Sequence, residues 1–284
     1  MSRQKLGQHF LSQISWRTRI AETLPVSPDS TWVEIGAGHG EMTELLATRA
    51  RRVIAIETDA ALASTLRERA AHSPAAANLP VETALPAKAV ESAAPRGWPN
   101  VEIVHADVLS LDLAALAGDR FRVYGNLPYY ITSPILTHLF RFADLIDSIH
   151  IVTQLEVAQR IAAHPRTRDY GYLSTLCQFY ARPELIFRIP PGAFQPPPKV
   201  TSALIEMHLP GGRASLGIRD EPAFLKFLQL CFAHKRKTLR NNLRDTYAHD
   251  AVAKGLAAGA LTDNSRAEEL TLHQFAQIFT SLAA

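Results

Sequence analysis

Residues 31–57 read TWVEIGAGHGEMTELLATRARRVIAIE, a strand, a glycine-rich turn, a helix and a second strand. TWVEI and RRVIAIE are short runs of β-branched and apolar residues, and EMTELLATRA has helical spacing. Similar strand-like runs follow as VEIVHAD (101–107), FRVYGN (121–126) and DSIHIVTQ (147–154). Short apolar strands that alternate with helical patterns predict βαβ units, so we expect an α/β fold with a mainly parallel sheet.

The pattern changes in the last third of the chain. PELIFRIP (183–190) and VTSALIEMHL (200–209) predict two strands close in sequence, which favours an antiparallel pair at the sheet edge. The segment LPGGRASLG that follows has the glycine and proline content of a linker, and the pattern from Asp220 onward is helical. We therefore predict a first domain over residues 1–210 and a small α-helical domain over 211–284.

One stretch, residues 73–99, interrupts the alternation of strands and helices. It contains eight alanines and five prolines, so it forms neither a continuous helix nor a packed strand. We interpret it as an insertion between the second and third βα units, with a short helix over residues 84–92 as the alternative.

The composition is that of an ordinary globular protein of 284 residues, 47% hydrophobic and 20% charged. No apolar run approaches the roughly 18 residues that a membrane helix needs, so we expect no membrane partner. Cys177 and Cys231 make neither a disulfide framework nor a metal-binding pair, and we predict no metal site. The start MSRQKLGQHFLSQ lacks the apolar region of a secretory signal, which favours a cytoplasmic protein over the alternative, a mitochondrial transit peptide. Nothing indicates a large exposed apolar stripe, so we expect a monomer.

Positive charge is clustered in two places, although the net charge is only +3. The cluster near the start contains Arg3, Lys5, Arg17 and Arg19. The cluster between residues 222 and 244 contains Lys226, Lys235, Arg236, Lys237, Arg240 and Arg244. Neither cluster includes an acid. Each fits either a solvated helix face or a surface that binds the phosphates of a nucleic acid, which gains free energy from counterion release.

The glycine-rich turn at residues 36–40 points to a bound ligand. Glycines let the backbone approach a ligand closely, and the helix that follows adds partial positive charge. Glu57 ends the next strand, where an acid can accept hydrogen bonds from ribose hydroxyls. Position 41 is Glu41, so the turn lacks the last glycine of a dinucleotide site and instead resembles the S-adenosylmethionine loop of Rossmann-like methyltransferases. A tight structural turn is the alternative.

Two further strand ends carry polar residues. Asp107 follows the third strand and is either an acceptor for the amino group of an adenine or a helix cap. Asn126-Leu127-Pro128-Tyr129 follows the fourth strand and resembles the [Asn/Asp]-Pro-Pro-[Tyr/Phe] motif of enzymes that methylate exocyclic amino groups of bases. The Asn126 oxygen and the Leu127 carbonyl would accept hydrogen bonds from the amine, and Tyr129 would stack on the base. A β-turn that carries asparagine and proline is the alternative.

Together these motifs resemble the bacterial ribosomal RNA adenine dimethyltransferase family (KsgA/RsmA). KLGQHFL (5–11), TQLEVAQR (153–160), GAFQPPPKV (192–200) and KRKTLRNNL (235–243) also match segments of that family in order. The resemblance covers most of the chain. It implies a Rossmann-like class I methyltransferase domain and a C-terminal helical accessory domain that binds RNA.

The resemblance also implies the site and its cofactor, S-adenosylmethionine. The residues expected to contact the cofactor are His9, Leu11, Gly36, Gly38, Glu57, Asp107 and Asn126. The catalytic motif is Asn126, Leu127, Pro128 and Tyr129. The substrate is expected to contact Tyr129, Phe194, Lys235, Arg236, Lys237 and Arg240. Phe194 is alternatively a core aromatic beneath the proline-rich turn.

The implied reaction is dimethylation of N6 of two adjacent adenines near the 3′ end of small-subunit rRNA, in a 30S pre-ribosomal particle. Two alternatives stay open on the sequence. One is a resistance-type enzyme that methylates a large-subunit adenine. The other is a non-catalytic ribosome assembly factor on the same fold.

Overall fold

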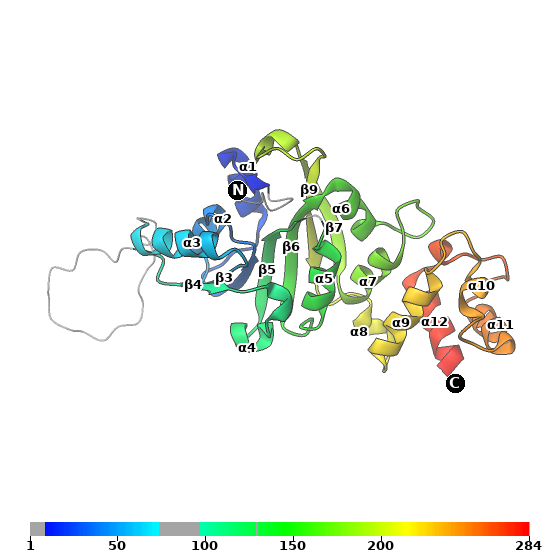
Figure 1. Cartoon of the computed structure of the whole chain (residues 1–284). Helices are drawn as coiled ribbons and strands as arrows, with labels where there is room; N and C mark the ends of the chain where they lie inside the picture. Colours follow the sequence, from blue (N-terminus) through cyan, green and yellow to red (C-terminus); the bar gives the residue numbers. More distant parts are fainter. Residues whose placement is uncertain (1–8, 74–96, 129, 284) are drawn as a thin grey trace. The chain divides into compact units, whose positions relative to one another are not determined.

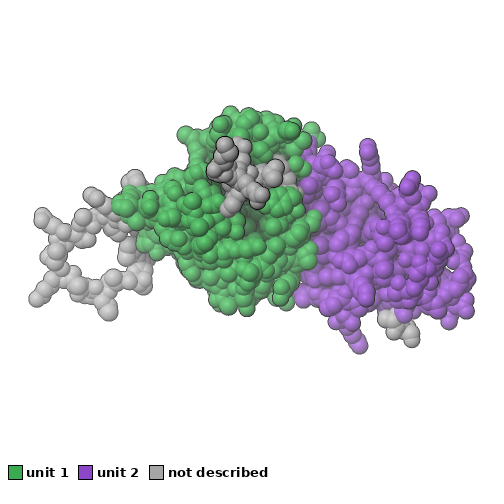
Figure 2. All heavy atoms as spheres, in the orientation of Figure 1, with its two compact units in different colours: residues 1–154, 186–205 green, residues 155–185, 206–284 purple. Residues whose placement is uncertain are grey.

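The chain forms two compact units, which Figure 2 distinguishes by colour. The structure is a computed structural model that describes residues 9–73, 97–128 and 130–283. Unit 1 takes its residues from 1–154 and 186–205, and unit 2 from 155–185 and 206–284. Each unit is therefore built from two separate stretches of the sequence.

Unit 1 is built around a seven-stranded sheet with the strand order β4-β3-β2-β5-β6-β9-β7 (Figure 1). Its last two strands, β9 and β7, also include residues of unit 2. The strands are β2 (Thr31–Ile35), β3 (Arg52–Glu57), β4 (Val101–His105), β5 (Phe121–Asn126), β6 (Ile146–Gln154), β7 (Arg182–Ile189) and β9 (Ser202–His208). Strand β2 pairs in parallel with β3 and β5, β3 with β4, and β5 with β6. The predicted α/β class is therefore confirmed, and β7 and β9 lie next to each other at one end of the sheet, as expected for an edge pair.

Hydrophobic strands and flanking helices fill the core of unit 1. Every residue of β2 is buried, as expected for a parallel strand that is covered on both faces, and Trp32 has no exposed surface. The helical segments along unit 1 are α1 (Ile14–Thr23), α2 (Glu41–Ala47), α3 (Ala60–His72), η2 (Val108–Ser110), α4 (Leu113–Ala117), α5 (Thr132–Phe140) and η3 (Pro191–Ala193). A separate two-stranded sheet joins β1 (Phe10–Leu11) to β8 (Phe194–Gln195) in antiparallel register.

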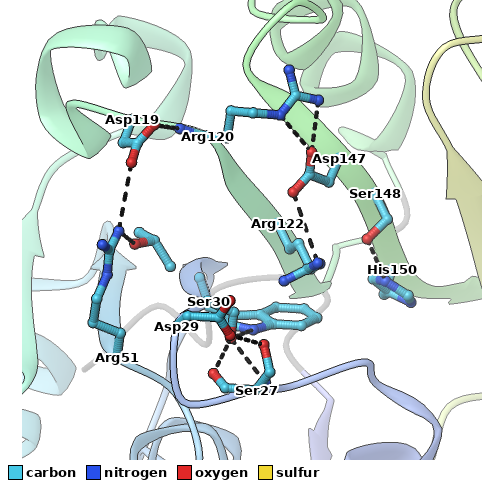
Figure 3. Close-up of polar contacts among 12 residues, drawn as sticks. Ser27, Asp29, Ser30, Arg51, Asp119, Arg120, Arg122, Asp147, Ser148 and His150 are labelled. Atoms are coloured by element: carbon cyan, nitrogen blue, oxygen red, sulfur yellow. Dashed lines mark hydrogen bonds and ion pairs between the residues drawn. The ribbon is translucent and has the colours of Figure 1, made fainter.

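Ion pairs and hydrogen bonds tie together the amino-terminal ends of the central strands (Figure 3). Arg120 pairs with Asp147 at 2.6 Å, which links the start of β5 to the start of β6. The Trp32 indole nitrogen donates to the Ser30 hydroxyl at 3.1 Å. This end of the sheet is thus occupied by contacts between its own side chains.

The two ends of the predicted insertion meet at one point. Gly97 donates a backbone hydrogen bond to the Ser73 carbonyl oxygen at 3.1 Å, and Trp98 donates to that of Ala70 at 2.8 Å. Gly97 has a φ of +108°, and a Cβ there would lie 2.6 Å from the Ala70 carbonyl oxygen, so only glycine fits. The insertion itself, including the alternative helix at 84–92, lies outside the described residues apart from these ends.

Unit 2 consists mainly of helices around an aromatic core. Its helical segments are α6 (Leu155–Ala162), α7 (Tyr172–Tyr180), α8 (Arg213–Leu216), α9 (Glu221–Cys231), α10 (Leu239–Leu243), α11 (His249–Ala258), η4 (Ala267–Glu269) and α12 (Leu272–Ala283). Phe224 packs against Phe179 of α7 and Phe279 of α12, with ring centroids 5.2 and 5.3 Å apart. A single boundary at residue 210 does not describe this unit, because α6 and α7 group with the C-terminal helices. Aromatic contacts that span about a hundred residues of sequence produce this grouping, and no local pattern indicates it.

Three further findings bear on function. No helix in the described part of the chain is long and apolar enough to cross a membrane. The described residues contain no group of three or more His, Cys, Asp or Glu side chains that could hold a metal ion. Cys177 and Cys231 are free and buried, and burial raises the pKa of both thiols, which makes them unreactive core residues.

Candidate functional site

A cavity opens at the carboxyl-terminal ends of the parallel strands of unit 1. It is lined by residues that follow β2, β3, β4 and β5, and by the segment before β1. Predicted site residues on its wall are His9, Gly36, Gly38, Glu57, Asp107, Asn126, Leu127 and Pro128. Because parallel strands all end at the same edge, residues from distant parts of the sequence meet there. Leu11 lies beside them, in a smaller adjoining cavity.

The glycine-rich turn forms one wall of the cavity. Gly36 and Gly38 have φ angles of +74° and +57°, which L side chains rarely adopt. A Cβ on Gly38 would lie 3.1 Å from the Phe10 ring. The glycines therefore shape a turn that crosses from β2 towards β3 and leave the backbone uncovered for a ligand.

Glu57 is held rigidly at the end of β3. Its side chain is almost fully buried, and its two oxygens accept hydrogen bonds from the backbone nitrogens of Gly38 and Asp59, each at 2.9 Å. Each carboxylate oxygen has a second acceptor position, so both oxygens keep the capacity to bind hydroxyl groups in the cavity. This arrangement suits a vicinal diol such as that of a ribose.

Asp107 has the capping role, one of the two alternatives that the sequence left open. It is the N-cap of η2, since one of its carboxylate oxygens accepts a hydrogen bond from the Leu109 nitrogen at 3.0 Å. It is also exposed at the cavity wall. The capping contact fixes the carboxylate and leaves its remaining acceptor positions available to a ligand.

Asn126 and Leu127 present two acceptors at the end of β5. The Asn126 amide nitrogen donates to the His9 carbonyl oxygen at 2.9 Å, which leaves the amide oxygen as an acceptor. The Leu127 nitrogen donates to the Val152 carbonyl oxygen at 3.0 Å, whereas no donor in the described part of the chain reaches the Leu127 carbonyl oxygen. Tyr129, the last residue of the motif, lies outside the described residues.

Phe194 does not lie on the cavity wall. Its side chain is 2% exposed and belongs to the hydrophobic core cluster with Leu11 and Ile189. Its strand, β8, pairs with β1, so it sits close in the chain to the segment that carries His9. In this structure the Phe194 ring therefore has the core position that the sequence offered as the alternative.

Two aromatic residues at the cavity are absent from the predicted site. Phe10 lines both cavities and packs edge-on against His39, with ring centroids 4.5 Å apart. Tyr130 is 76% exposed and lines the main cavity. Their positions directly after His9 and directly after Tyr129 are the sequence signal that identifies them.

A buried carboxyl group, Glu34, also lies next to the site and was not predicted. It lines the smaller cavity, is 2% exposed, and its Oε2 has no hydrogen-bond partner in the described part of the chain. Burial raises the pKa of Glu34 to about 8. Its partner in the β2–β5 register is Tyr124, whose hydroxyl group is likewise buried without a hydrogen bond from described residues. Glu34 is thus protonated at neutral pH.

Side chains of the two basic clusters differ in whether their charge is paired with a carboxylate. Lys235, Arg236 and Lys237 are exposed on the connection between α9 and α10 in unit 2. Arg240, in contrast, forms an ion pair with Asp263, which makes it less available to a substrate. In unit 1, the Arg19 guanidinium lies 4.3 Å from the centre of the Phe187 ring.

Comparison with known proteins gives a consistent result. The family model "Ribosomal RNA adenine dimethylase" matches residues 1–79 and 87–284, and the unmatched gap falls inside the alanine- and proline-rich stretch. A protein named ribosomal RNA small subunit methyltransferase A from Koribacter versatilis is 40% identical over 98% of this chain and 93% of its own length. The protein of the same name from Acidobacterium capsulatum is 43% identical over 98% and 90%.

Solved structures agree on the fold. A dimethyladenosine transferase from Plasmodium falciparum superposes with a TM-score of 0.72 over 95% of this chain and 96% of its own, at 20% identity. The 23S rRNA methyltransferase ErmE gives a TM-score of 0.65 at 27% identity, over 97% and 100%. Through its motifs, its fold and the family model that spans nearly its whole length, the chain belongs to the ribosomal RNA adenine dimethylase family.

Proposed function

We propose that this protein uses S-adenosylmethionine to dimethylate N6 of two adjacent adenines near the 3′ end of small-subunit rRNA. The observation that carries the proposal is the pair of acceptors on Asn126 and Leu127 at the rim of a cavity with a glycine turn. The proposed setting is a 30S pre-ribosomal particle in the cytoplasm, with the protein acting as a monomer.

The residues of the cavity fit the methyl donor. Gly36 and Gly38 form a backbone turn on the cavity wall, called the cradle here, and a side chain at either position would disturb it. Glu57 would accept hydrogen bonds from the ribose hydroxyls, and Asp107 from the adenine amino group. When bound, S-adenosylmethionine supplies a methyl group on a positively charged sulfonium, which is strongly electrophilic.

The chain's own contribution to the reaction is to hold the target amine. The lone pair of adenine N6 is delocalised into the ring, so the amine is a poor nucleophile. Acceptance of its two hydrogens by the Asn126 oxygen and the Leu127 carbonyl would orient the nitrogen and favour a more pyramidal geometry. No strong general base is required, because the alkylated amine is very acidic. Alignment of the amine with the methyl group accounts for most of the rate enhancement.

The relatives favour the small subunit over the large one as the substrate. The curated relatives that are 40% and 43% identical carry the small-subunit name, whereas the large-subunit enzyme ErmE is 27% identical. Exposed Lys235, Arg236 and Lys237 support binding to RNA phosphates.

Incubation with radiolabelled S-adenosylmethionine and undermethylated subunits, small and large separately, tests the proposal. We expect label on two adjacent adenines of the small subunit. Label on the large subunit would support the proposed methyl transfer but would show that small-subunit rRNA is not the substrate. Absence of label from both, with cofactor binding intact, would overturn the enzymatic function and favour an assembly factor.

A further inference from the structure

A side-chain contact brings two basic loops of unit 2 together. The Lys235 ammonium group donates a hydrogen bond to the Arg168 carbonyl oxygen at 2.7 Å, although the residues are 67 positions apart. Lys235 lies on the connection between α9 and α10, and Arg168 on the connection between α6 and α7. The second connection, residues 163–171, therefore lies beside the basic segment 234–237.

Backbone contacts and one buried tyrosine hold the 163–171 loop in place. Arg166 has a φ of +67°, and its nitrogen donates to the Glu268 carbonyl oxygen at 2.7 Å. Tyr170 is 1% exposed, and its hydroxyl donates to the Leu270 carbonyl oxygen at 3.0 Å. The Thr167 hydroxyl donates to the His164 carbonyl oxygen at 2.7 Å. None of these contacts uses the charge of an arginine side chain.

The charged groups of the loop are correspondingly free. Arg166 and Arg168 are exposed, and in the described part of the chain neither guanidinium has an ion pair or a hydrogen bond. Asp169 is the only acid between residues 163 and 171. Arg240 shows the opposite behaviour, because its charge is paired with Asp263. Several exposed cations without carboxylate partners, on a fixed backbone, are the arrangement expected of a polyanion-binding surface.

We propose that Arg166 and Arg168 extend the segment Lys235–Lys237 into one surface that binds the phosphate backbone of RNA. This inference rests on the proposed function, since the RNA is the ribosomal substrate. The surface is suited to phosphates rather than to bases, because no large hydrophobic side chain is exposed in the described part of unit 2. The planar guanidinium group of arginine can donate two parallel hydrogen bonds to the oxygens of one phosphate. Binding there would therefore be largely independent of base sequence.

The test compares Arg166→Gln, Arg168→Gln and the double variant with wild type. Arg219→Gln is the matched control, because Arg219 is exposed in the same unit just before α9, whereas Lys235 follows the end of that helix. The 11-residue helix α9, about 16 Å long, lies between the two positions in the chain. Affinity is measured at several KCl concentrations with two probes, undermethylated small subunits and a plain RNA duplex. Cofactor affinity and thermal unfolding show whether each variant is folded.

We expect each single variant to reduce the slope of log K against log[KCl] by about 0.7–0.9, and the double variant by about twice that. Both probes should respond, with unchanged cofactor affinity, and Arg219→Gln should behave as wild type. Slopes and affinities of the double variant equal to those of Arg219→Gln would overturn the inference. Wild-type protein that binds RNA with this salt dependence but transfers no methyl group would count against the proposed function alone.

Discussion

The Asn126 side-chain nitrogen lies 2.9 Å from the His9 carbonyl oxygen and donates a hydrogen bond to it. The contact joins the end of β5 to the segment before β1, 117 positions earlier in the sequence. Because the nitrogen is committed to a backbone acceptor, the amide cannot flip without losing this bond, and its oxygen keeps one orientation. The amino-terminal segment therefore positions the acceptor that we assign to the target amine.

Asn126→Ala tests that acceptor directly. We expect turnover on undermethylated small subunits to fall by roughly 10²–10³-fold, the usual effect of removing one transition-state hydrogen-bonding group. The thermal unfolding midpoint should change little, because the variant loses a single part-buried hydrogen bond, worth about 1 kcal/mol. Asn126→Asp is the companion variant: it keeps an acceptor oxygen but cannot donate to His9, so intermediate turnover is expected. Near-normal turnover of Asn126→Ala would show that the Asn126 oxygen is not the acceptor for the target amine.

Glu34 predicts a pH dependence of stability. Its pKa is about 8 in the folded protein and about 4.5 when unperturbed, so between these values the folded state holds a proton that the unfolded chain has released. The free energy of unfolding should therefore decrease as pH rises from 5 to 8, by up to ~1.4 kcal/mol per pH unit. Glu34→Gln should remove this slope in urea unfolding measured at pH 5, 6, 7 and 8.

Glu184→Gln is the control for that experiment, because Glu184 is exposed. It should keep the wild-type slope. If Glu34→Gln and Glu184→Gln show the same dependence on pH, Glu34 is ionised in the folded protein and the assignment of a buried neutral acid is wrong.

Gly38→Ala tests the cradle for the methyl donor. Both the φ of +57° and the 3.1 Å approach of a Cβ to the Phe10 ring oppose a side chain here. We expect cofactor affinity, measured by calorimetry, to fall at least tenfold. Gly118→Ala separates the two causes, since Gly118 has a φ of +72° but nothing within 4 Å of a Cβ. That variant should lose roughly 1 kcal/mol of stability and bind the cofactor as wild type does. Equal cofactor affinity in both variants would contradict the cradle.

Phe194 is tested by truncation in two steps. Because the ring is buried in the core, Phe194→Ala should destabilise the protein by about 3–5 kcal/mol. Phe194→Leu retains most of the apolar volume and should remain folded, with kcat/KM for small subunits close to wild type. A tenfold or larger loss of kcat/KM in folded Phe194→Leu, restored in Phe194→Tyr, would instead support stacking on the adenine.

The local pattern of the sequence was sufficient for the fold of unit 1 and for most of its cavity. Strand ends are visible in the sequence, and in a parallel sheet they converge, so Gly36, Glu57 and Asn126 could be placed together in advance. Asp107 both caps η2 and lies on the cavity wall, and both properties follow from its position after strand β4.

The remaining features depend on contacts between distant residues. A short apolar strand does not reveal which of its polar side chains is buried, so the state of Glu34 was missed. The grouping of α6 and α7 with unit 2 arises from packing such as that of Phe179 on Phe224. The contact between Lys235 and Arg168 likewise has no local signal, because the two residues are 67 positions apart in the sequence.

The hydrogen bond from Gly97 to the Ser73 carbonyl oxygen closes the two ends of the predicted insertion against each other. This junction is therefore a suitable place for a segment of different length. Because the chain leaves and returns at one point, a segment of different length alters only the loop-closure entropy, about 0.6 kcal/mol for each doubling of length. Ser73 and Gly97 are the two residues that fix this junction on the framework of unit 1. We therefore expect a peptide tag inserted between them to leave the sheet and the cavity at its opposite strand ends unchanged.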